Sequence, residues 1–282
     1  MQHFKLPLFV LFASVSMTGF AQQTKIELLK GQKYQVETNT KMNTSADVMG
    51  QVMENNTESK NTTVYEVLDA GSDDIKLQST ITKMLVNASM MGQNMAFDSD
   101  KKDNEGPVAD VLSKMMNKAK TIKLDTKGSI TKQDAPAEEE GQASMIGMGT
   151  SGNETATELF IPALIGRELK AGDSFTDISA VKKEKYSSRD SGTYKITAVE
   201  NGVASISYTG TQVISMVMEQ MGMEMNSNSN NVVKTELQVN SNTGMVMAKA
   251  SVTESATTIE AGGMTIPATG KTIVTVKITQ AM

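Results

Sequence analysis

The feature that most constrains the fold is a pattern that occurs twice: a tyrosine, a turn, a long alternating segment and a Met-Gly hairpin. The run that begins at Tyr65 aligns with the run that begins at Tyr194, with one residue of difference before the hairpin glycine. The preceding residues are also alike, because residues 29–31 read Leu-Lys-Gly and residues 169–172 read Leu-Lys-Ala-Gly. Duplicated supersecondary units build one continuous sheet or two facing sheets. The pattern therefore predicts two related halves, and it says little about chemistry.

Apolar and polar residues alternate in both halves with the period of two that predicts β-strands. Residues 75–84 and 203–218 are clear examples. Asn-Gly at 201–202 and Asn-Thr-Gly at 242–244 separate such segments and tolerate the positive φ angles of tight turns. We therefore predict a mainly β fold of curved antiparallel sheets, formed by two duplicated meander halves. The sequence leaves open whether the halves share one sheet or form two.

One segment departs from the β pattern. Apolar residues at 108, 111, 112, 115, 116 and 119 follow helical spacing, and Pro107 suits the first turn of a helix. We predict one amphipathic helix at about 107–119, packed on the sheet through Met115 and Met116.

Residues 1–21 have the organisation of a secretory signal peptide. Lys5 supplies the positive charge, residues 6–15 are apolar, and residues 19–21 offer small side chains for cleavage. The apolar stretch is too short to cross a bilayer core of ~30 Å. We expect an exported mature chain without a transmembrane segment, located in the periplasm or outside the cell.

The chain contains no cysteine, and its single histidine is His3, within the signal segment. Catalysis by Ser-His-Asp or Cys-His sites is therefore excluded, as are ordinary zinc sites. The absence of cysteine also excludes disulfides and a thiol-linked lipid anchor, which favours a Gram-negative over a eukaryotic exported protein. We expect a non-enzymatic protein with no catalytic residues, no metal site and no cofactor.

The net charge of the chain limits the classes of binding partner that we expect. Without Lys5 the chain has 26 basic and 32 acidic residues, a net charge of −6. Nucleic acids and anionic membranes attract clustered Lys and Arg, so we expect neither as a partner.

The segment between residues 132 and 158 is rich in Ala, Gly, Ser and Glu, unlike the sequence on either side. Stretches of this length without periodicity are linkers or mobile lids. The apolar residues 159–165 follow, and Pro162 excludes a central strand there. The predicted organisation is a signal peptide at 1–21, a first β half with the helix at 22–131, a flexible linker or lid at 132–158 and a second β half at 159–282.

Twenty of the 22 methionines lie after residue 21, and tryptophan is absent. Methionine adapts to irregular gaps, so we expect a deformable interior and a Met-lined concave surface. Each Met-Gly hairpin is expected to form a type II′ turn with Gly first, which places Met90 opposite Met95 and Gln220 opposite Met225. The candidate ligand-binding side chains are Met90, Met95, Met115, Met116, Met218 and Met225.

The chain resembles exported, methionine-rich β proteins of unknown function from Gram-negative gliding and gut bacteria. The resemblance rests on residues 20–22 at the signal end, the LKGQKY opening, the Met-Gly-Gln hairpins and residues 164–175. It implies no functional residue. A looser likeness, of fold only, is to periplasmic lipoprotein carriers, whose half-barrel sheet wraps a helix and encloses an apolar cavity.

The leading hypothesis is an exported binding protein that holds a lipid or other apolar or amphipathic ligand, or an envelope protein partner, on a concave sheet. The first alternative is a structural or adhesive envelope protein. The second is Met-based copper binding, since thioethers are ligands that select Cu(I).

Overall fold

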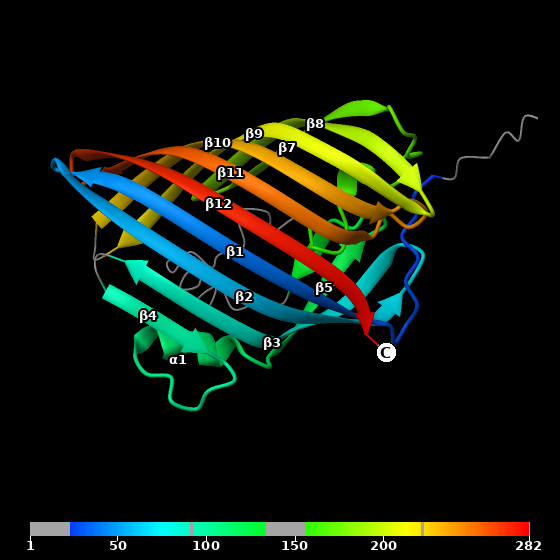
Figure 1. The fold of residues 1–282 in the computed structure, drawn as a ribbon, viewed down its shortest axis with the longest axis horizontal. Coiled ribbons are helices and arrows are strands. Elements are labelled where there is room, and N and C mark those ends of the chain that lie inside the picture. The colour runs from blue at the N-terminus through cyan, green and yellow to red at the C-terminus, as the bar shows by residue number, and fades with distance from the viewer. Residues whose placement is uncertain (1–22, 91–92, 134–155, 221–222, 282) are drawn as a thin grey trace, which may run out of the picture.

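The computed structural model describes residues 23–90, 93–133, 156–220 and 223–281, which form an open antiparallel sheet of twelve strands with one α-helix (Figure 1). The first half contributes β1 (Lys33–Val48), β2 (Gln51–Ala70), β3 (Asp74–Met90), β4 (Gln93–Asp98), α1 (Pro107–Met115), β5 (Ala119–Asp125) and β6 (Ile130–Gln133). The second half contributes a short 3-10 helix (Pro162–Leu164), β7 (Ser174–Lys183), β8 (Tyr186–Glu200), β9 (Val203–Gln220), β10 (Met223–Asn240), β11 (Val246–Ala261) and β12 (Met264–Ala281). The predicted mainly β fold with a helix is confirmed.

The two halves share one sheet, because β1 of the first half pairs with β12 of the second. Their register runs without a bulge from Lys33 opposite Ala281 to Ala46 opposite Ala268. The strand order is β6-β5-β3-β2-β1-β12-β11-β10-β9-β8-β7, and β4 pairs with β3 beyond this path. Among the described strands, β6 and β7 therefore form the two ends of the open sheet.

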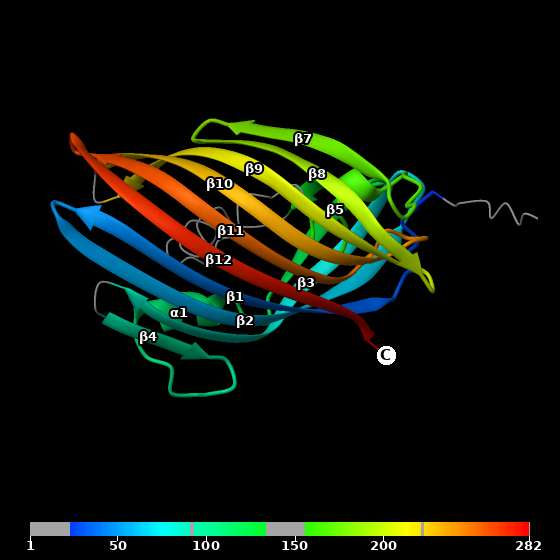
Figure 2. The same cartoon turned by 45° about the horizontal axis from the view of Figure 1, so that its top comes forward.

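The sheet curls so that both ends turn toward the same side (Figure 2). We call this side the hollow side and the opposite side the convex side. Successive side chains of a strand point to opposite faces. In β1, Tyr34 and Val36 are buried on the hollow side, whereas Lys33 and Lys41 lie on the convex side.

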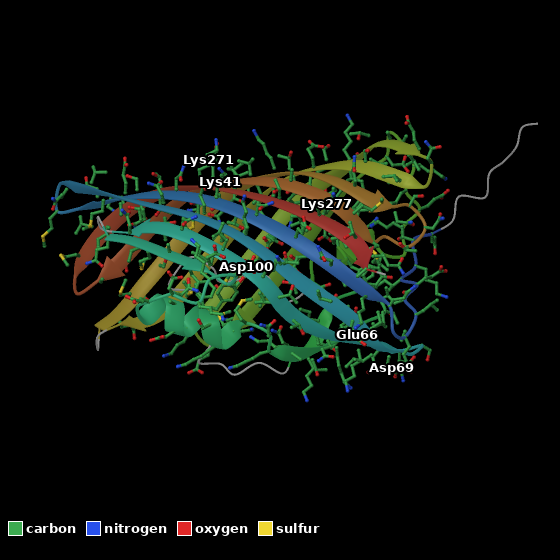
Figure 3. The ribbon with its side chains drawn as sticks, turned by 60° about the horizontal axis from the view of Figure 1, so that its bottom comes forward. Lys41, Glu66, Asp69, Asp100, Lys271 and Lys277 are labelled. Atoms are coloured by element: carbon green, nitrogen blue, oxygen red, sulfur yellow. The ribbon has the colours of Figure 1, made fainter. Side chains whose placement is uncertain are left out.

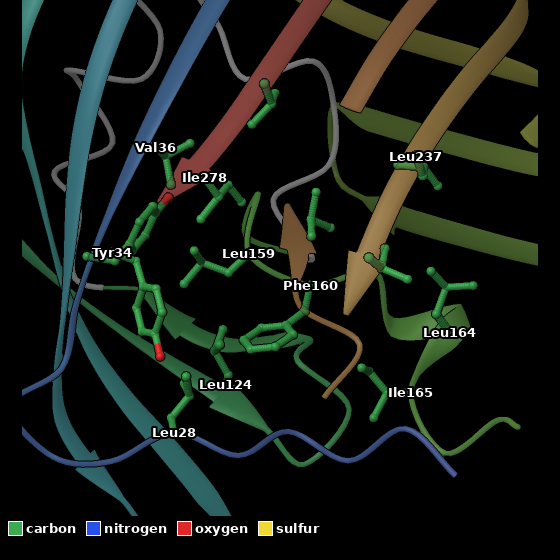
Figure 4. Close-up of a cluster of buried hydrophobic side chains, with 14 of the residues drawn as sticks. Leu28, Tyr34, Val36, Leu124, Leu159, Phe160, Leu164, Ile165, Leu237 and Ile278 are labelled. Atoms are coloured by element: carbon green, nitrogen blue, oxygen red, sulfur yellow. The ribbon is translucent and has the colours of Figure 1, made fainter. Parts of the chain in front are cut away.

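A plug, defined as residues 23–29 and 156–169, fills one end of the hollow side. Its Leu159 and Phe160 are at most 1% exposed and lie among inward side chains of the sheet (Figure 4). The backbone N–H of Val246 donates to the Leu159 carbonyl oxygen at 2.9 Å, which ties the plug to β11. One buried cluster thus joins the plug with inward residues of nine strands, and it forms the main core.

The convex side is charged. Lys41, Glu66 and Lys271 are among the charged side chains of this side (Figure 3). Lys33 pairs with Glu66 at 3.1 Å and Lys41 with Glu58 at 2.8 Å, each across the β1–β2 ladder. Exposed pairs of this kind contribute about 0–1 kcal/mol each. The convex side also carries exposed apolar side chains, including Ile178, Val213 and Ile273.

The core of the described chain is aliphatic and aromatic. Phe160 and a set of Leu, Ile and Val residues are its largest fully buried side chains, and Met84 is the sole methionine among its buried hydrophobic residues. The expected Met-rich interior is therefore wrong for this part of the chain. The reason is position, since the plug covers strand ends rich in Leu, Ile and Val, while many methionines lie near the opposite strand ends.

The described Met-Gly turn is type I′, not the expected type II′. Met49 and Gly50 both have positive φ, 56° and 81°, and β1 and β2 pair directly outside them through Val48 and Gln51. A type I′ turn matches the right-handed twist of the flanking strands and requires positive φ at both loop positions. The turn at Gly262 and Gly263 has the same geometry, with φ of 57° and 82°.

α1 begins at Pro107, as predicted, but it ends at Met115, short of the expected end at residue 119. Asn117 adopts a φ of 57°, and Ala119 already belongs to β5, which pairs with β3. Pairing with β3 therefore overrides the helical apolar spacing. Met115 and Met116 pack against the buried cluster that β3, β4 and α1 share, which confirms that the helix packs on the sheet.

The repeated sequence pattern has a local counterpart in the structure. Gly31 and Gly172 have φ of 86° and 93°, and their N–H groups donate at 2.8 Å to the carbonyls of Val67 and Ile196. A register shift follows Val67 in the β2–β3 ladder and Ile196 in the β8–β9 ladder. Beyond these hairpins the halves differ, since β4 has 6 residues and β10 has 18. Duplication of the complete halves stays a prediction.

Two predicted segments fall largely or wholly outside the described residues. They are the signal peptide at 1–21 and most of the linker or lid at 132–158. The described ends of the latter belong to the folded structure, because Gln133 ends β6 and Thr157 is buried in the plug.

Candidate binding face

Beyond the plug, hydroxyl and amide side chains line the hollow side of the sheet. Inward positions on six adjacent strands form this surface, which we call the hydroxyl belt: Thr57, Ser59, Thr40, Thr44, Thr272, Ser251, Thr253, Ser255, Asn231, Thr235 and Gln212. Five of the eleven are buried. Buried polar groups are ordinarily hydrogen-bonded, so the partners of these side chains define what the belt can still bind.

Hydrogen bonds cross the belt from strand to strand. The hydroxyls of Thr235 and Ser251 lie 2.8 Å apart. Asn231 Nδ2 donates to Gln212 Oε1 at 3.0 Å, and Gln212 Nε2 donates to Asp190 Oδ1 on β8 at 2.6 Å. Asn231 Oδ1 is buried without a hydrogen-bond partner. The chain of amides therefore ends in one free acceptor.

An aromatic row continues the hollow side at the β7–β9 end of the sheet. The rings of Phe175 and Tyr194 are stacked with centroids 5.2 Å apart, and those of Tyr194 and Tyr208 are 4.6 Å apart. The guanidinium of Arg167, from the plug, lies 3.8 Å from the Phe175 ring centre. Burial raises the pKa of Tyr194 and Tyr208, so both phenols stay protonated at neutral pH.

Two carboxylates face this aromatic row. Burial raises the pKa of Asp190, the hydrogen bond from Gln212 opposes that shift, and the nearby charge of Asp177 adds to it. Asp177 lies opposite Gly192 in the β7–β8 ladder, which puts it on the same face as Tyr194 and Asp190. The β7–β9 wall thus carries two carboxylates, of which Asp190 is partly withdrawn from water, and the Arg167 guanidinium lies on Phe175 of the same wall.

A second polar group lies where the plug meets the sheet. Tyr65 donates from its hydroxyl to Glu158 Oε2 of the plug at 2.5 Å. Burial and the Glu158 charge raise the pKa of Tyr65 well above its usual value, so it remains a donor. Burial lowers the pKa of Lys249, an inward residue of β11, and Glu158 partly offsets that shift. Glu158 therefore links the plug electrostatically to both β2 and β11.

Apolar side chains return near the strand ends farthest from the plug. Half-buried inward residues there are Ile214, Met216, Met225, Ile259 and Ile266. The hollow side is therefore apolar at the plug, polar along the hydroxyl belt and richer in apolar side chains toward the far strand ends, where Ser227, Ser229 and Thr257 also lie inward.

The six predicted ligand-binding methionines do not form one site. Met115 and Met116 support α1 on the sheet, and Met95 lies opposite Ala88 on β3. Met90 pairs with Gln93, not with Met95 as expected. Residues 91–92 and the Met90 side chain lie outside the described part.

In the other hairpin, Met218 pairs with Met225, so the expected pairing of Gln220 with Met225 is wrong by the same displacement. Residues 221–222 and the Met218 side chain lie outside the described part. Four strands, β2, β1, β12 and β11, separate this hairpin from β3 in the sheet. The two methionine groups therefore belong to different walls.

Sequence reasoning missed the residues that carry charge and hydrogen bonds on the hollow side: Asp190, Tyr208, Gln212, Asn231, Glu158 and Lys249. One feature of the sequence could have indicated this region. Gly192 and Gly210 lie inside long strands, where a glycine often marks the close approach of another group.

Across the described ranges, no group of three or more acidic or histidine side chains is arranged to hold a metal ion. Over the same residues, no helix has the length and apolar character needed to cross a membrane.

Comparison with known proteins gives a partial match to a family of unknown function and a similarity of fold. Residues 72–134, which contain β3 through β6, match the model of the family of unknown function DUF6263. No curated protein sequence matches the chain.

Solved structures show fold similarity. A structure of lipid–protein interactions in lipovitellin aligns with a TM-score of 0.51 and 11% identity over 91% of this chain. The chain spans 26% of that protein's length, about a quarter. The β domain of the Bordetella autotransporter BrkA aligns with a TM-score of 0.25, 8% identity and coverage of 88% and 99% of the two chains. An outer membrane channel from Pseudomonas putida F1 aligns with a TM-score of 0.21 and 8% identity, and the alignment covers 93% of this chain and 98% of the channel. This chain is thus a mainly β protein with a sheet similar in fold to part of lipovitellin.

Proposed function

We propose that this protein is an exported, non-enzymatic binding protein of the Gram-negative cell envelope that holds an amphipathic molecule on the hollow side of its sheet. The observation that carries the proposal is the sequence of surfaces along the hollow side: apolar plug, hydroxyl belt, apolar far end. A ligand with both a polar group and a hydrocarbon part matches these surfaces better than a purely apolar one.

Energetic reasoning supports an amphipathic ligand over a purely apolar one. Asn231 Oδ1 and Asn61 Oδ1 are buried inward acceptors without partners. A buried acceptor without a partner costs about 1–3 kcal/mol; hydrocarbon beside it leaves that cost in place, whereas a ligand donor that reaches the acceptor removes it. The apolar far end offers about 25 cal/mol for each Å² of hydrocarbon that it covers.

Fold similarity to lipovitellin is consistent with this proposal, since that structure concerns lipid–protein interactions.

Two threonines of β12 provide a matched test. Thr272 points to the hollow side, and Thr275 is exposed on the convex side. Thr272→Phe should fill the belt and abolish binding of dodecyl maltoside and of a hydrophobic dye, whereas Thr275→Phe should bind both as the parent does. Native mass spectrometry of the mildly extracted parent should also show bound lipid. Equal binding by both variants would exclude the hollow side as the site.

A protein that binds no amphiphile and self-associates would instead support the structural or adhesive alternative. Edge strand β7 carries Ile178, which is 61% exposed, and an unpaired edge is the element through which such association occurs.

Copper binding by methionines is a second alternative function, and one observation on the backbone register supports it. Met216 of β9 and Met225 of β10 share the inward face of the β9–β10 hairpin. Thioethers bind Cu(I), although such sites usually also recruit His or Cys. Titration of Cu(I) into the parent and into a variant with Met218, Met223 and Met225 changed to Leu tests this function, and equal affinity would remove it.

A further inference from the structure

We propose that the β7–β10 wall of the hollow side is a recognition site for the primary ammonium group of an amphipathic ligand. Tyr208 supplies an aromatic surface, Asp177 and Asp190 supply negative charge, and Asn231 supplies a free acceptor. This inference rests on the proposed function, because it assigns the chemistry of the ligand's polar end.

A pair of glycines positions the aromatic surface. Gly192 and Gly210 lie opposite one another in the β8–β9 ladder, directly beside Tyr208. A Cβ atom added at Gly192 would overlap the Tyr208 ring, and one at Gly210 would overlap the Tyr208 hydroxyl. Tyr208 therefore lies across both glycines, along the floor of the hollow side. Any side chain at either glycine would force the ring away.

The carboxylates lie near this ring and influence its hydroxyl. Burial raises the pKa of Tyr208, and both carboxylate charges add to that shift, Asp190 more than Asp177. A cation on an aromatic face gains about 0.5–2 kcal/mol, and the larger values belong to sites withdrawn from water. Carboxylates beside that face add direct attraction, so the wall favours a positive group over a neutral or negative one.

Asn231 gives independent support for a ligand with hydrogen-bond donors. Asn231 is 7% exposed, its Nδ2 donates a hydrogen bond to Gln212 Oε1, and its Oδ1 has no hydrogen-bond partner. Gln212 also binds Asp190, so Asn231 belongs to the same network as the carboxylates. Amide oxygens and carboxylates both accept hydrogen bonds from N–H donors. A primary ammonium group carries three such donors.

The test compares three amphiphiles with the same twelve-carbon chain, all below their micellar concentrations: dodecylammonium, dodecyl maltoside and dodecyl sulfate. Calorimetry should show dodecylammonium binding most tightly to the parent. Asp190→Asn should weaken dodecylammonium about tenfold, which is about 1.4 kcal/mol, and leave dodecyl maltoside unchanged. Tyr208→Leu should also weaken dodecylammonium, whereas Tyr208→Phe, which keeps the ring, should retain most of the affinity.

Glu236→Gln is the matched control, because it removes one negative charge from an exposed convex position on β10. Equal weakening by Glu236→Gln and Asp190→Asn would show that net charge alone attracts the cation, and it would overturn the inference. Equal binding of all three amphiphiles, unaffected by Asp190→Asn, would overturn the inference and leave the proposed function standing. Failure of all three to bind the parent would overturn both.

Discussion

Removal of the Phe160 side chain should destabilise the whole protein, because the plug holds the two walls of the sheet together. Phe160 is 1% exposed and lies in the main core cluster. A buried aromatic side chain covers about 150–250 Å², worth roughly 4–6 kcal/mol at about 25 cal/mol per Å². Alanine retains part of that burial, so Phe160→Ala should lower the free energy of unfolding by about 3–5 kcal/mol, in the range of measured Phe→Ala losses.

Urea unfolding followed by circular dichroism measures this loss. With a slope of about 3 kcal/mol per molar, the unfolding midpoint should fall by more than about 1 M. The control is Ile178→Ala on edge strand β7, where the side chain is 61% exposed and the change should stay within about 0.5 kcal/mol. A Phe160→Ala protein that loses less than about 1 kcal/mol would refute the role of the plug as the core of the sheet.

Three further substitutions test the packing and electrostatics. Gly128→Ala should destabilise by about 3 kcal/mol in thermal unfolding, because Gly128 has a φ of +82° and a Cβ there would lie 2.8 Å from Phe160 Cβ; an unchanged melting temperature would argue against that contact. Tyr65→Phe removes the donor to Glu158 and should cost about 1.5 kcal/mol in urea unfolding, with no loss expected if the plug were held without this bond. Asp190→Asn should stabilise the protein at pH 7. The pKa of Asp190 is raised in the folded state, so ionisation of this carboxyl opposes folding above that pKa. The gain in stability from the substitution should vanish below the pKa of the carboxyl in the unfolded chain. A stability difference that grows as the pH falls would contradict this sign.

The sequence predicted strands where one strand face is apolar. Residues 37–63, by contrast, read as polar almost throughout, yet they form most of β1 and β2. Their convex side chains meet water and their inward side chains belong to the hydroxyl belt, so the alternation of apolar and polar residues disappears. Register across β1 and β12 then defines these strands, and such long-range pairing leaves no local signal.

Turn and site predictions failed for related reasons. A Met-Gly pair is compatible with two hairpin types, and the described turn at Met49 and Gly50 is type I′. At the next hairpin the expected register was displaced by two residues, as Met90 opposite Gln93 shows. Methionines were nominated for their side-chain type and for their expected places in the hairpins and on the helix. Tyr208 gains its role only from two glycines and a carboxylate on neighbouring strands, an arrangement that no single segment of sequence contains.

Methionine methyl NMR tests the central claim most directly, because methionines lie on both sides of the sheet. Met42 and Met225 are inward and half-buried, whereas Met247 is 41% exposed and Met49, at a turn, is 85% exposed. Titration with dodecylammonium or dodecyl maltoside should shift the methyl signals of Met42 and Met225 and leave those of Met247 and Met49 in place. Shifts confined to Met247 and Met49 would contradict binding on the hollow side.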